Sequence, residues 1–69
     1  MNGEMYYATL TRNDSIVYGV FAETTDKISK EVDKVSRSGD YVKVYHGYFD
    51  LVGNFVSETD EPYNEYEID

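Results

Sequence analysis

Apolar side chains recur at every second position in two neighbouring segments near the N-terminus, residues 5–11 and residues 16–22. This period of two is typical of β-strands that bury one face. The residues between them, 12–15, are turn-forming types. Gly19 indicates a bulge or a close neighbour in the second segment, because it leaves a place without a side chain. We therefore predict a β-hairpin.

The spacing of apolar residues then changes to that of a helix. Residues 23–26 combine threonines, which can cap free backbone amides, with acidic groups that suit the positive end of a helix. Ile28, Val32 and Val35 follow at intervals of four and three, so they form a narrow apolar stripe. Gly39 can adopt the left-handed conformation of a C-cap. The pattern predicts one amphipathic helix that ends near this glycine.

A second pair of strands is predicted after the helix. Residues 41–49 are rich in β-forming types, and residues 50–53 have Asp and Gly at the first and fourth positions of a type I turn. The chain then returns through residues 54–58. The order ββαββ favours a two-layer α+β fold in which a four-stranded antiparallel sheet carries one helix on one face.

The length of 69 residues fits a single domain, because so short a chain cannot support two cores. We assign residues 1–58 to this domain and residues 59–69 to an acidic C-terminal tail that contains tyrosine. In the tail, Tyr66 and Ile68 alternate with acids. An extended segment of this kind has one anchoring face and one anionic face, so the tail can dock or add a strand.

Charge is distributed unevenly along the chain. The net charge is −8, and all six basic residues lie within residues 12–43. Residues 44–69 carry seven acids and no Lys or Arg. Direct binding to nucleic acid would have to overcome repulsion from the phosphates, so an electropositive partner is favoured. The simple alternative is a solvated tail that keeps a small protein soluble.

Aromatic residues occur on both faces of the predicted strands, and one short helix cannot cover all of them. Some must be exposed or must meet another chain, and tyrosine is enriched at interfaces. We therefore expect Tyr7, Tyr41 and Tyr45 to form a dimer or partner interface. The simpler interpretation of any single tyrosine is that it lies at the edge of the core with its hydroxyl in water.

The sequence contains no recognisable motif for catalysis or cofactor binding. The chain has no cysteine, and its five glycines are scattered rather than gathered in a phosphate-binding loop. His46, the single histidine, alternates with valines in a strand and is assigned a structural or surface role. Glu58, Asp60 and Glu61 lack the pattern of a calcium loop. We predict a protein that is not an enzyme and uses no metal or cofactor, and we expect a cytoplasmic location without membrane insertion.

Small size, acidity, absence of cysteine and tyrosine-rich strands together resemble phage-encoded DNA-mimic proteins that disable host factors. Within that group the chain looks most like a Bacillus phage host-takeover protein that inhibits the nucleoid protein HU. The resemblance implies an acidic, dimeric inhibitor that occupies the DNA-binding surface of HU in an infected bacterium. It rests on no signature motif, so the contact residues come from the charge pattern alone: Asp50, Glu58, Asp60, Glu61, Glu65 and Glu67.

Other functions remain open at this point. Anti-restriction and anti-CRISPR proteins share the same description. A protein-interaction module that binds a different kind of target through its tyrosine-rich sheet face is a further alternative, and a structural or housekeeping domain is another.

Overall fold

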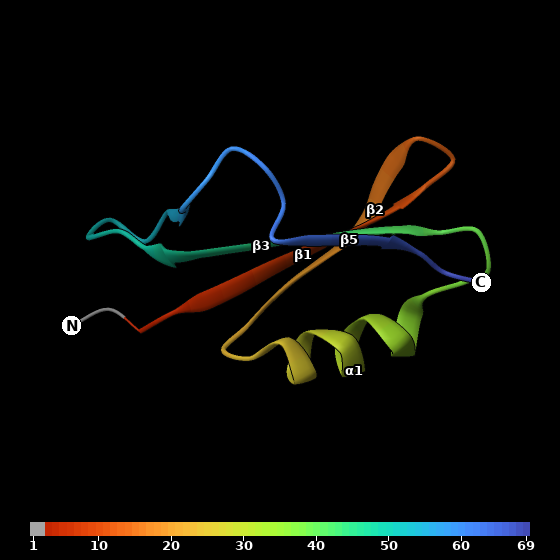
Figure 1. Ribbon diagram of the computed structural model, residues 1–69, viewed down its shortest axis with the longest axis horizontal. Coiled ribbons are helices and arrows are strands. Elements are labelled where there is room, and N and C mark those ends of the chain that lie inside the picture. Colours follow the sequence, from red (N-terminus) through yellow and green to blue (C-terminus); the bar gives the residue numbers. More distant parts are fainter. Residues whose placement is uncertain (1–2) are drawn as a thin grey trace.

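The computed structural model describes residues 3–69, which form one helix and one antiparallel sheet (Figure 1). The predicted α+β class, with one helix against one face of an antiparallel sheet, is confirmed. The order along the chain is ββαβββ, because residues of the predicted tail form an additional strand. The elements are β1 (Met5–Arg12), β2 (Ser15–Ala22), α1 (Thr25–Val35), β3 (Tyr41–Phe49), β4 (Phe55–Ser57) and β5 (Asn64–Glu67).

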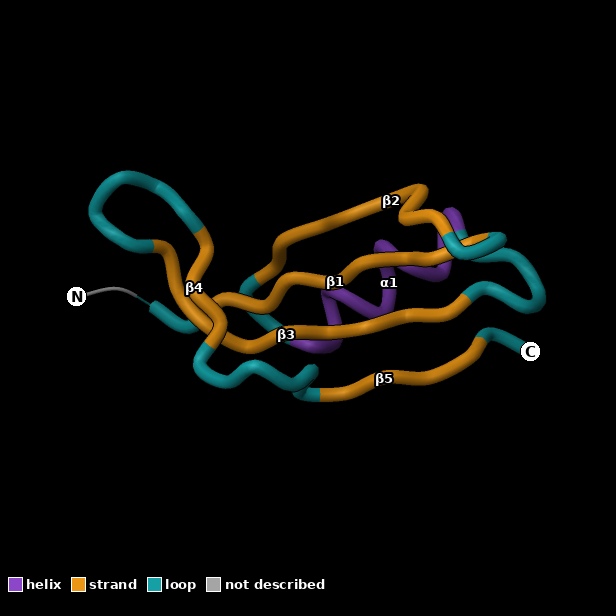
Figure 2. The backbone as a smooth tube through the Cα atoms, turned by 90° about the horizontal axis from the view of Figure 1, so that it is seen from above, coloured by secondary structure: helices purple, strands orange, loops and turns teal. Residues whose placement is uncertain are grey.

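The sheet is organised around β3, which has neighbours on both sides. The strand order is β2-β1-β3-β4, and β5 also pairs with β3. The outer side of β3 is therefore shared: Gly47 to Phe49 pair with β4, and Tyr41 to Val44 pair with β5. Figure 2 shows β2 at one edge of the sheet and β5 at the other. The close approach of β4 requires Gly47, since a Cβ there would lie 1.9 Å from the carbonyl oxygen of Val56.

The core lies between α1 and the face of the sheet that it covers. Its buried residues come from β1, β3 and α1: Ala8, Leu10, Val42, Val44, Ile28 and Val32. The predicted apolar stripe is right for its first two residues and wrong for Val35, which is 38% exposed. Partly buried residues of β2 and of the C-terminal segment pack around this core.

Helix α1 begins where the sequence predicts and ends earlier. The side chain of Thr24 caps it by accepting a hydrogen bond from the backbone N–H of Lys27 (3.2 Å). The helix ends at Val35, and Ser36 is the C-cap. Gly39 is not the C-cap, although its φ of 90° lies in the left-handed region. Within residues 3–69, α1 is too short and too polar to cross a membrane.

The first hairpin has a tight turn and one bulge. Asn13 and Asp14 make the turn, with φ values of 53° and 65° that these two residue types tolerate. The bulge lies at Val17, because Leu10 pairs with Tyr18 and Thr11 with Ile16. Gly19 is therefore not the bulge. It leaves room for a close neighbour, the second possibility that the sequence suggested, because a Cβ there would lie 3.0 Å from the Tyr7 hydroxyl.

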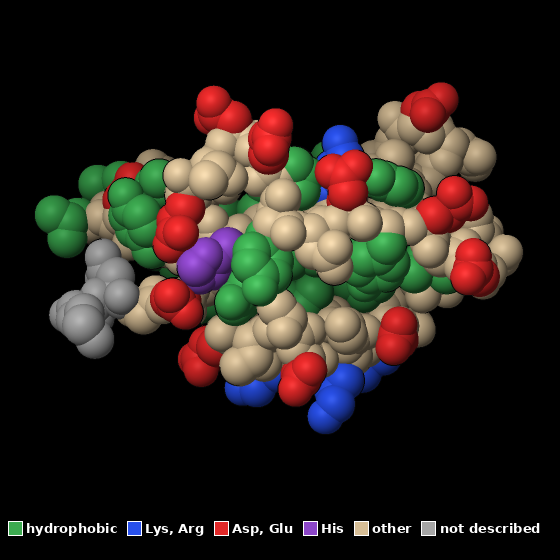
Figure 3. Space-filling view, in the orientation of Figure 1, with side chains coloured by type: hydrophobic (Ala, Val, Ile, Leu, Met, Phe, Trp, Pro, Cys, Tyr) green, Lys and Arg blue, Asp and Glu red, His purple; other side chains and the backbone are tan. Residues whose placement is uncertain are grey.

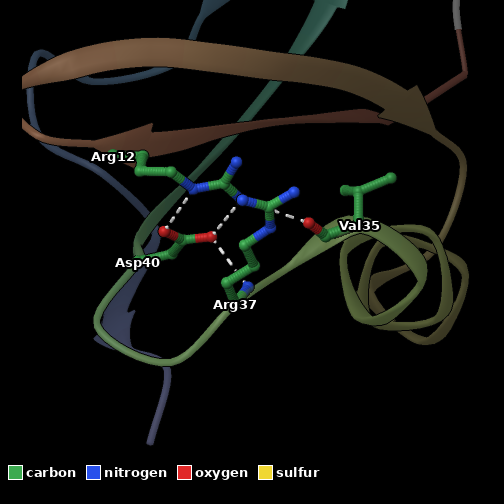
Figure 4. Close-up of polar contacts among 4 residues, drawn as sticks. All are labelled: Arg12, Val35, Arg37 and Asp40. Carbon is green, nitrogen blue, oxygen red and sulfur yellow. Dashed lines mark hydrogen bonds and ion pairs between the residues drawn. The ribbon is translucent and has the colours of Figure 1, made fainter.

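A partly buried ion pair joins β1 to the segment between α1 and β3 (Figure 4). The carboxylate of Asp40 is 2% exposed and accepts hydrogen bonds from Arg12 Nε (2.9 Å) and Arg12 Nη2 (2.7 Å). It also accepts one from the backbone N–H of Arg37 (2.8 Å). The hydrogen bonds from Arg12 are the main reason that the pKa of Asp40 falls from 3.8 to about 2, and they prevail over burial, which acts in the opposite direction.

We expect Asp40→Asn to lower Tm at pH 7 by at least about 5 °C, since Arg12 would lose a buried anionic partner. The pKa of Asp40 is lower in the folded state than in the unfolded chain. The stabilisation is therefore complete above about pH 4 and is lost as the pH falls toward 2. The Tm difference between wild type and variant should consequently shrink over that interval.

Circular dichroism melts at pH 7, 4, 3 and 2 measure this difference. Asp60→Asn is the matched control, because Asp60 is exposed and should leave Tm unchanged. A difference between wild type and Asp40→Asn that stays constant down to pH 2 would contradict the assignment.

Candidate functional site

Most of the predicted contact residues lie on one edge of the sheet, which we call the acidic edge. It comprises β5 with its flanking residues, from 58 to 69, and contains no Lys or Arg. Figure 3 views the molecule from this side and shows acidic side chains spread across it, with basic side chains gathered mainly below, where the helix lies. The carboxylates of the acidic edge belong to Glu58, Asp60, Glu61, Glu65, Glu67 and Asp69.

The backbone of the acidic edge is held in place by hydrogen bonds to β3 and to the segment before it. The N–H of Tyr63 donates to the carbonyl of Val44 (2.7 Å), before β5 begins. After β5 ends, the N–H of Ile68 donates to the carbonyl of Asp40 (2.8 Å), and the N–H of Gly39 donates to the carbonyl of Ile68 (2.8 Å). The segment predicted as a tail is thus fixed at both ends of its strand.

Alternation along β5 separates its anchoring side chains from its charged ones. Tyr66 and Ile68 pack against the core on the helix side. Burial raises the pKa of Tyr66, and the carboxylate of Asp33 on α1 raises it further. The charge of Asp33, on the helix, thus acts on the hydroxyl of Tyr66 in β5. No sequence signal identifies Asp33 as a neighbour, because helical and strand residues meet only after folding.

Glu65 is oriented by a tyrosine of the neighbouring strand. The hydroxyl of Tyr41 donates a hydrogen bond to Glu65 Oε1 at 2.5 Å. This hydrogen bond is the largest of the effects that raise the pKa of Tyr41, followed by burial. Lys43 lies directly across from Glu65 in the register of β3 and β5. Tyr41, predicted as an interface residue, is thus engaged within its own chain.

Each ring nitrogen of His46 has a glutamate nearby. Glu58 Oε2 is 3.3 Å from Nδ1 of His46, and Glu4 Oε1 is 3.5 Å from Nε2 of the same ring. The imidazole stacks on Tyr6 with 4.7 Å between ring centroids. His46 therefore lies at the boundary of the core and the acidic edge. Glu4 was missing from the predicted contact residues, because 54 positions of sequence separate it from Glu58.

Four carboxylates of the acidic edge form no hydrogen bond or ion pair in the part of the chain that the structure describes: those of Asp60, Glu61, Glu67 and Asp69. Asp60 and Glu61 lie in the loop before β5, and Glu67 lies within the strand. These three residues and Asp69, the last of the chain, are all exposed. The loop is ordered instead by Thr59, whose hydroxyl donates to the carbonyl of Glu61 (2.8 Å).

Asp50 is separated from the other predicted contact residues. It lies at the tip of the hairpin between β3 and β4, at the end of the molecule opposite the C-terminus (Figure 1). Its Oδ1 accepts hydrogen bonds from the backbone N–H groups of Val52 (3.0 Å) and Asn54 (2.9 Å). The geometry gives Asp50 a role in holding this turn.

The face of the sheet opposite α1 carries a second candidate surface, which we call the aromatic face. Its five members are half-buried or exposed, and their rings contact one another: Tyr7, Phe21, Tyr45, Phe49 and Phe55. Ring centroids of Tyr7 and Phe21 are 4.5 Å apart. Two of the predicted interface tyrosines, Tyr7 and Tyr45, belong to this face. The phenylalanines were not singled out from the sequence, because only the strand register brings them together.

Neither surface is arranged for metal binding. Among residues 3–69, no three side chains of the types His, Cys, Asp and Glu converge to hold an ion. No protein-family model, curated protein or solved structure matches the chain. Its function is therefore argued from the two surfaces.

We expect Glu65→Gln to lower the pKa of Tyr41 toward its ordinary value of 10.0, because a neutral amide no longer favours the protonated hydroxyl. NMR titration of the tyrosine ring carbons measures this pKa. Glu67→Gln is the control, since Glu67 makes only the smallest of the contributions to Tyr41. An unchanged pKa in Glu65→Gln would show that β5 does not hold Glu65 against Tyr41 in solution.

Proposed function

We propose that this protein is an inhibitor that presents the acidic edge to the DNA-binding surface of a basic host protein and so blocks DNA binding. The nucleoid protein HU is the best single candidate for that host protein. The observation that carries the proposal is the acidic edge itself: six carboxylates and no cation in residues 58–69, on a segment fixed against β3.

The spacing of carboxylates along β5 supports this proposal. Glu65 and Glu67 are two residues apart, which corresponds to about 6.8 Å along a strand. One strand of duplex DNA carries a charge every ~3.4 Å of axis, so these two carboxylates match every second phosphate. A groove lined with Lys and Arg distinguishes phosphate from carboxylate poorly by charge alone.

Charge density sets a limit on how well one copy can imitate DNA. The longest dimension of the molecule is 38 Å, and a duplex of that length carries about 22 phosphates. A net charge of −8 is about a third of that number. To compete with DNA, the protein must therefore rely on having its acids gathered on one edge and held in fixed positions. Groups that are already fixed lose less entropy on binding.

A second function is favoured by the aromatic face. The rings of this face lie on the side of the sheet opposite α1, and Phe21 is 46% exposed. Exposed aromatic clusters mark protein-binding surfaces. In this alternative the protein is an interaction module whose acidity serves solubility, and its target need not bind DNA.

Neutralising the acidic edge should weaken inhibition specifically. We expect the triple variant Asp60→Asn, Glu65→Gln, Glu67→Gln to need about 10-fold more protein to displace labelled duplex DNA from purified HU. Fluorescence anisotropy follows the displacement. The matched control, Asp14→Asn, Glu23→Gln, Asp26→Asn, changes the net charge equally but lies away from the edge, and should stay within about threefold of wild type. Equal losses in both variants would refute a specific role for the acidic edge.

Calorimetry at rising salt concentrations should show that the affinity for HU falls steeply, because the contacts are between exposed charges. If the protein does not bind HU but displaces DNA from a restriction or CRISPR nuclease, that nuclease would replace HU as the proposed target.

The aromatic alternative is tested with Tyr45→Thr, which truncates the aromatic face while leaving every acid in place. The acidic-edge proposal predicts displacement of DNA within about twofold of wild type. Tyr48→Thr is the matched control, because Tyr48 is outside the aromatic face and 40% exposed. A loss of binding in Tyr45→Thr alone, with the fold retained by circular dichroism, would favour the interaction module.

A further inference from the structure

Strand β2 forms the free edge of the sheet on the side opposite the acidic edge (Figure 2). Its eight residues, Ser15–Ala22, include no charged residue and no proline. Ile16 is 66% exposed and Val17 is 49% exposed. Natural edge strands are usually protected by charges, prolines, bulges or short length, since their free N–H and C=O groups accept another strand. Here the only such feature is the bulge at Val17, which leaves residues 18–22 regular.

An open groove adjoins this edge where β2 passes into α1. Its volume is about 570 Å³. The sheet contributes apolar groups from Val20, Phe21 and Ala22, and the helix contributes Lys27 and Lys30. The groove thus combines an apolar strand with cationic side chains above it.

The groove is lined by lysines as well as by glutamates, unlike the acidic edge. Glu31, which also lines it, forms an ion pair with Lys34 (Nζ to Oε2, 2.9 Å). Lys27 and Lys30 form no ion pair or side-chain hydrogen bond among residues 3–69. Glu23 is the remaining carboxylate of the lining. The first turn of α1 adds the positive end of the helix dipole, and Asp26 lies in the same turn. Two lysines without an ion-pair partner among residues 3–69, together with Glu23, therefore border an uncharged strand.

We propose that the β2 edge and its groove bind an extended acidic segment of another protein. The segment adds to residues 18–22 as a further strand. Its side chains alternate: carboxylates on the helix side approach Lys27 and Lys30, and apolar side chains on the other side lie beside Phe21. Backbone hydrogen bonds supply affinity in this mode, and the alternation of side chains supplies specificity.

The net charge of −8 does not prevent an acidic ligand from binding at this edge. Three strand spacings separate β2 from β5, which is about 14 Å. The Debye length at physiological salt is about 8 Å, so repulsion from the acidic edge is largely screened there. Contacts with Lys27 and Lys30 are shorter than this length and persist.

A second copy of this chain fits the edge less well. Two β2 strands paired around a twofold axis would run antiparallel, and both helices would then lie on the same face of the joined sheet. The flanks that carry Lys27 and Lys30 would approach each other, which is repulsive. An acidic segment removes this repulsion. The proposal does not depend on the acidic edge or on its binding partner.

The test uses the full-length protein labelled with ¹⁵N and a short N-acetylated peptide that alternates glutamate with valine. At physiological salt, the peptide should shift the amide resonances of residues 18–22, 27 and 30, with the acidic edge unaffected. The double variant Lys27→Gln, Lys30→Gln should raise the dissociation constant by about fivefold. The matched control Arg37→Gln, Lys43→Gln removes two cations elsewhere and should leave it within about twofold of wild type.

Three results would overturn the proposal. The first is the absence of shifts at residues 18–22. The second is equal binding of a control peptide in which lysine replaces glutamate, which would show that charge does not select the ligand. The third is a concentration-dependent shift of the same residues without peptide, which would assign the edge to a second copy of the chain. None of these results bears on displacement of DNA by the acidic edge.

Discussion

The carboxylate of Asp40 holds together the elements on which both surfaces depend. It is 2% exposed, so it must be paired with a cation to remain charged in the fold. Arg12 supplies this charge from the end of β1, and the same guanidinium donates to the carbonyl of Val35 at the end of α1 (3.3 Å). The backbone of Asp40 in turn accepts from Ile68. One residue therefore links β1, the end of α1, the start of β3 and the segment after β5.

This arrangement explains why the acidic C-terminal segment is a strand. Carboxylates along residues 58–69 repel one another and favour an extended, solvated chain. Pairing of β5 with β3 and packing of Tyr66 and Ile68 against the core oppose that repulsion. Because apolar and acidic residues alternate, the strand buries its apolar side chains without burying a carboxylate.

The helix divides the surface charge as well as covering the core. Its acidic residue Asp33 lies near Tyr66 on the side of β5, whereas Lys27 and Lys30 border the groove beside β2. The two edges of the sheet consequently differ in character: residues 58–69 carry acids without Lys or Arg, and β2 is an uncharged strand flanked by lysines and glutamates.

Much of the fold follows from local patterns in the sequence. Alternation of apolar residues located β1, β2 and β3, and the threonine before the helix located its start. The predicted end of the helix was wrong. Gly39 is a suitable C-cap by residue type, but it lies in the turn before β3, where its N–H donates to the carbonyl of Ile68. The role of Gly19 depends on Tyr7, which only strand pairing brings over it.

By itself the sequence determined the class of fold, the anionic character of the chain and the identity of most acids on one edge, because periodicity and charge are local properties of the chain. Tertiary structure alone decided which of these groups act together. Strand pairing fixed β5 against β3, moved Asp50 away from the acidic edge and gathered five rings on the aromatic face. It also left the outer edge of β2 without a partner strand, beside the lysines of α1. These outcomes depend on contacts between residues far apart in the chain, which no local pattern encodes.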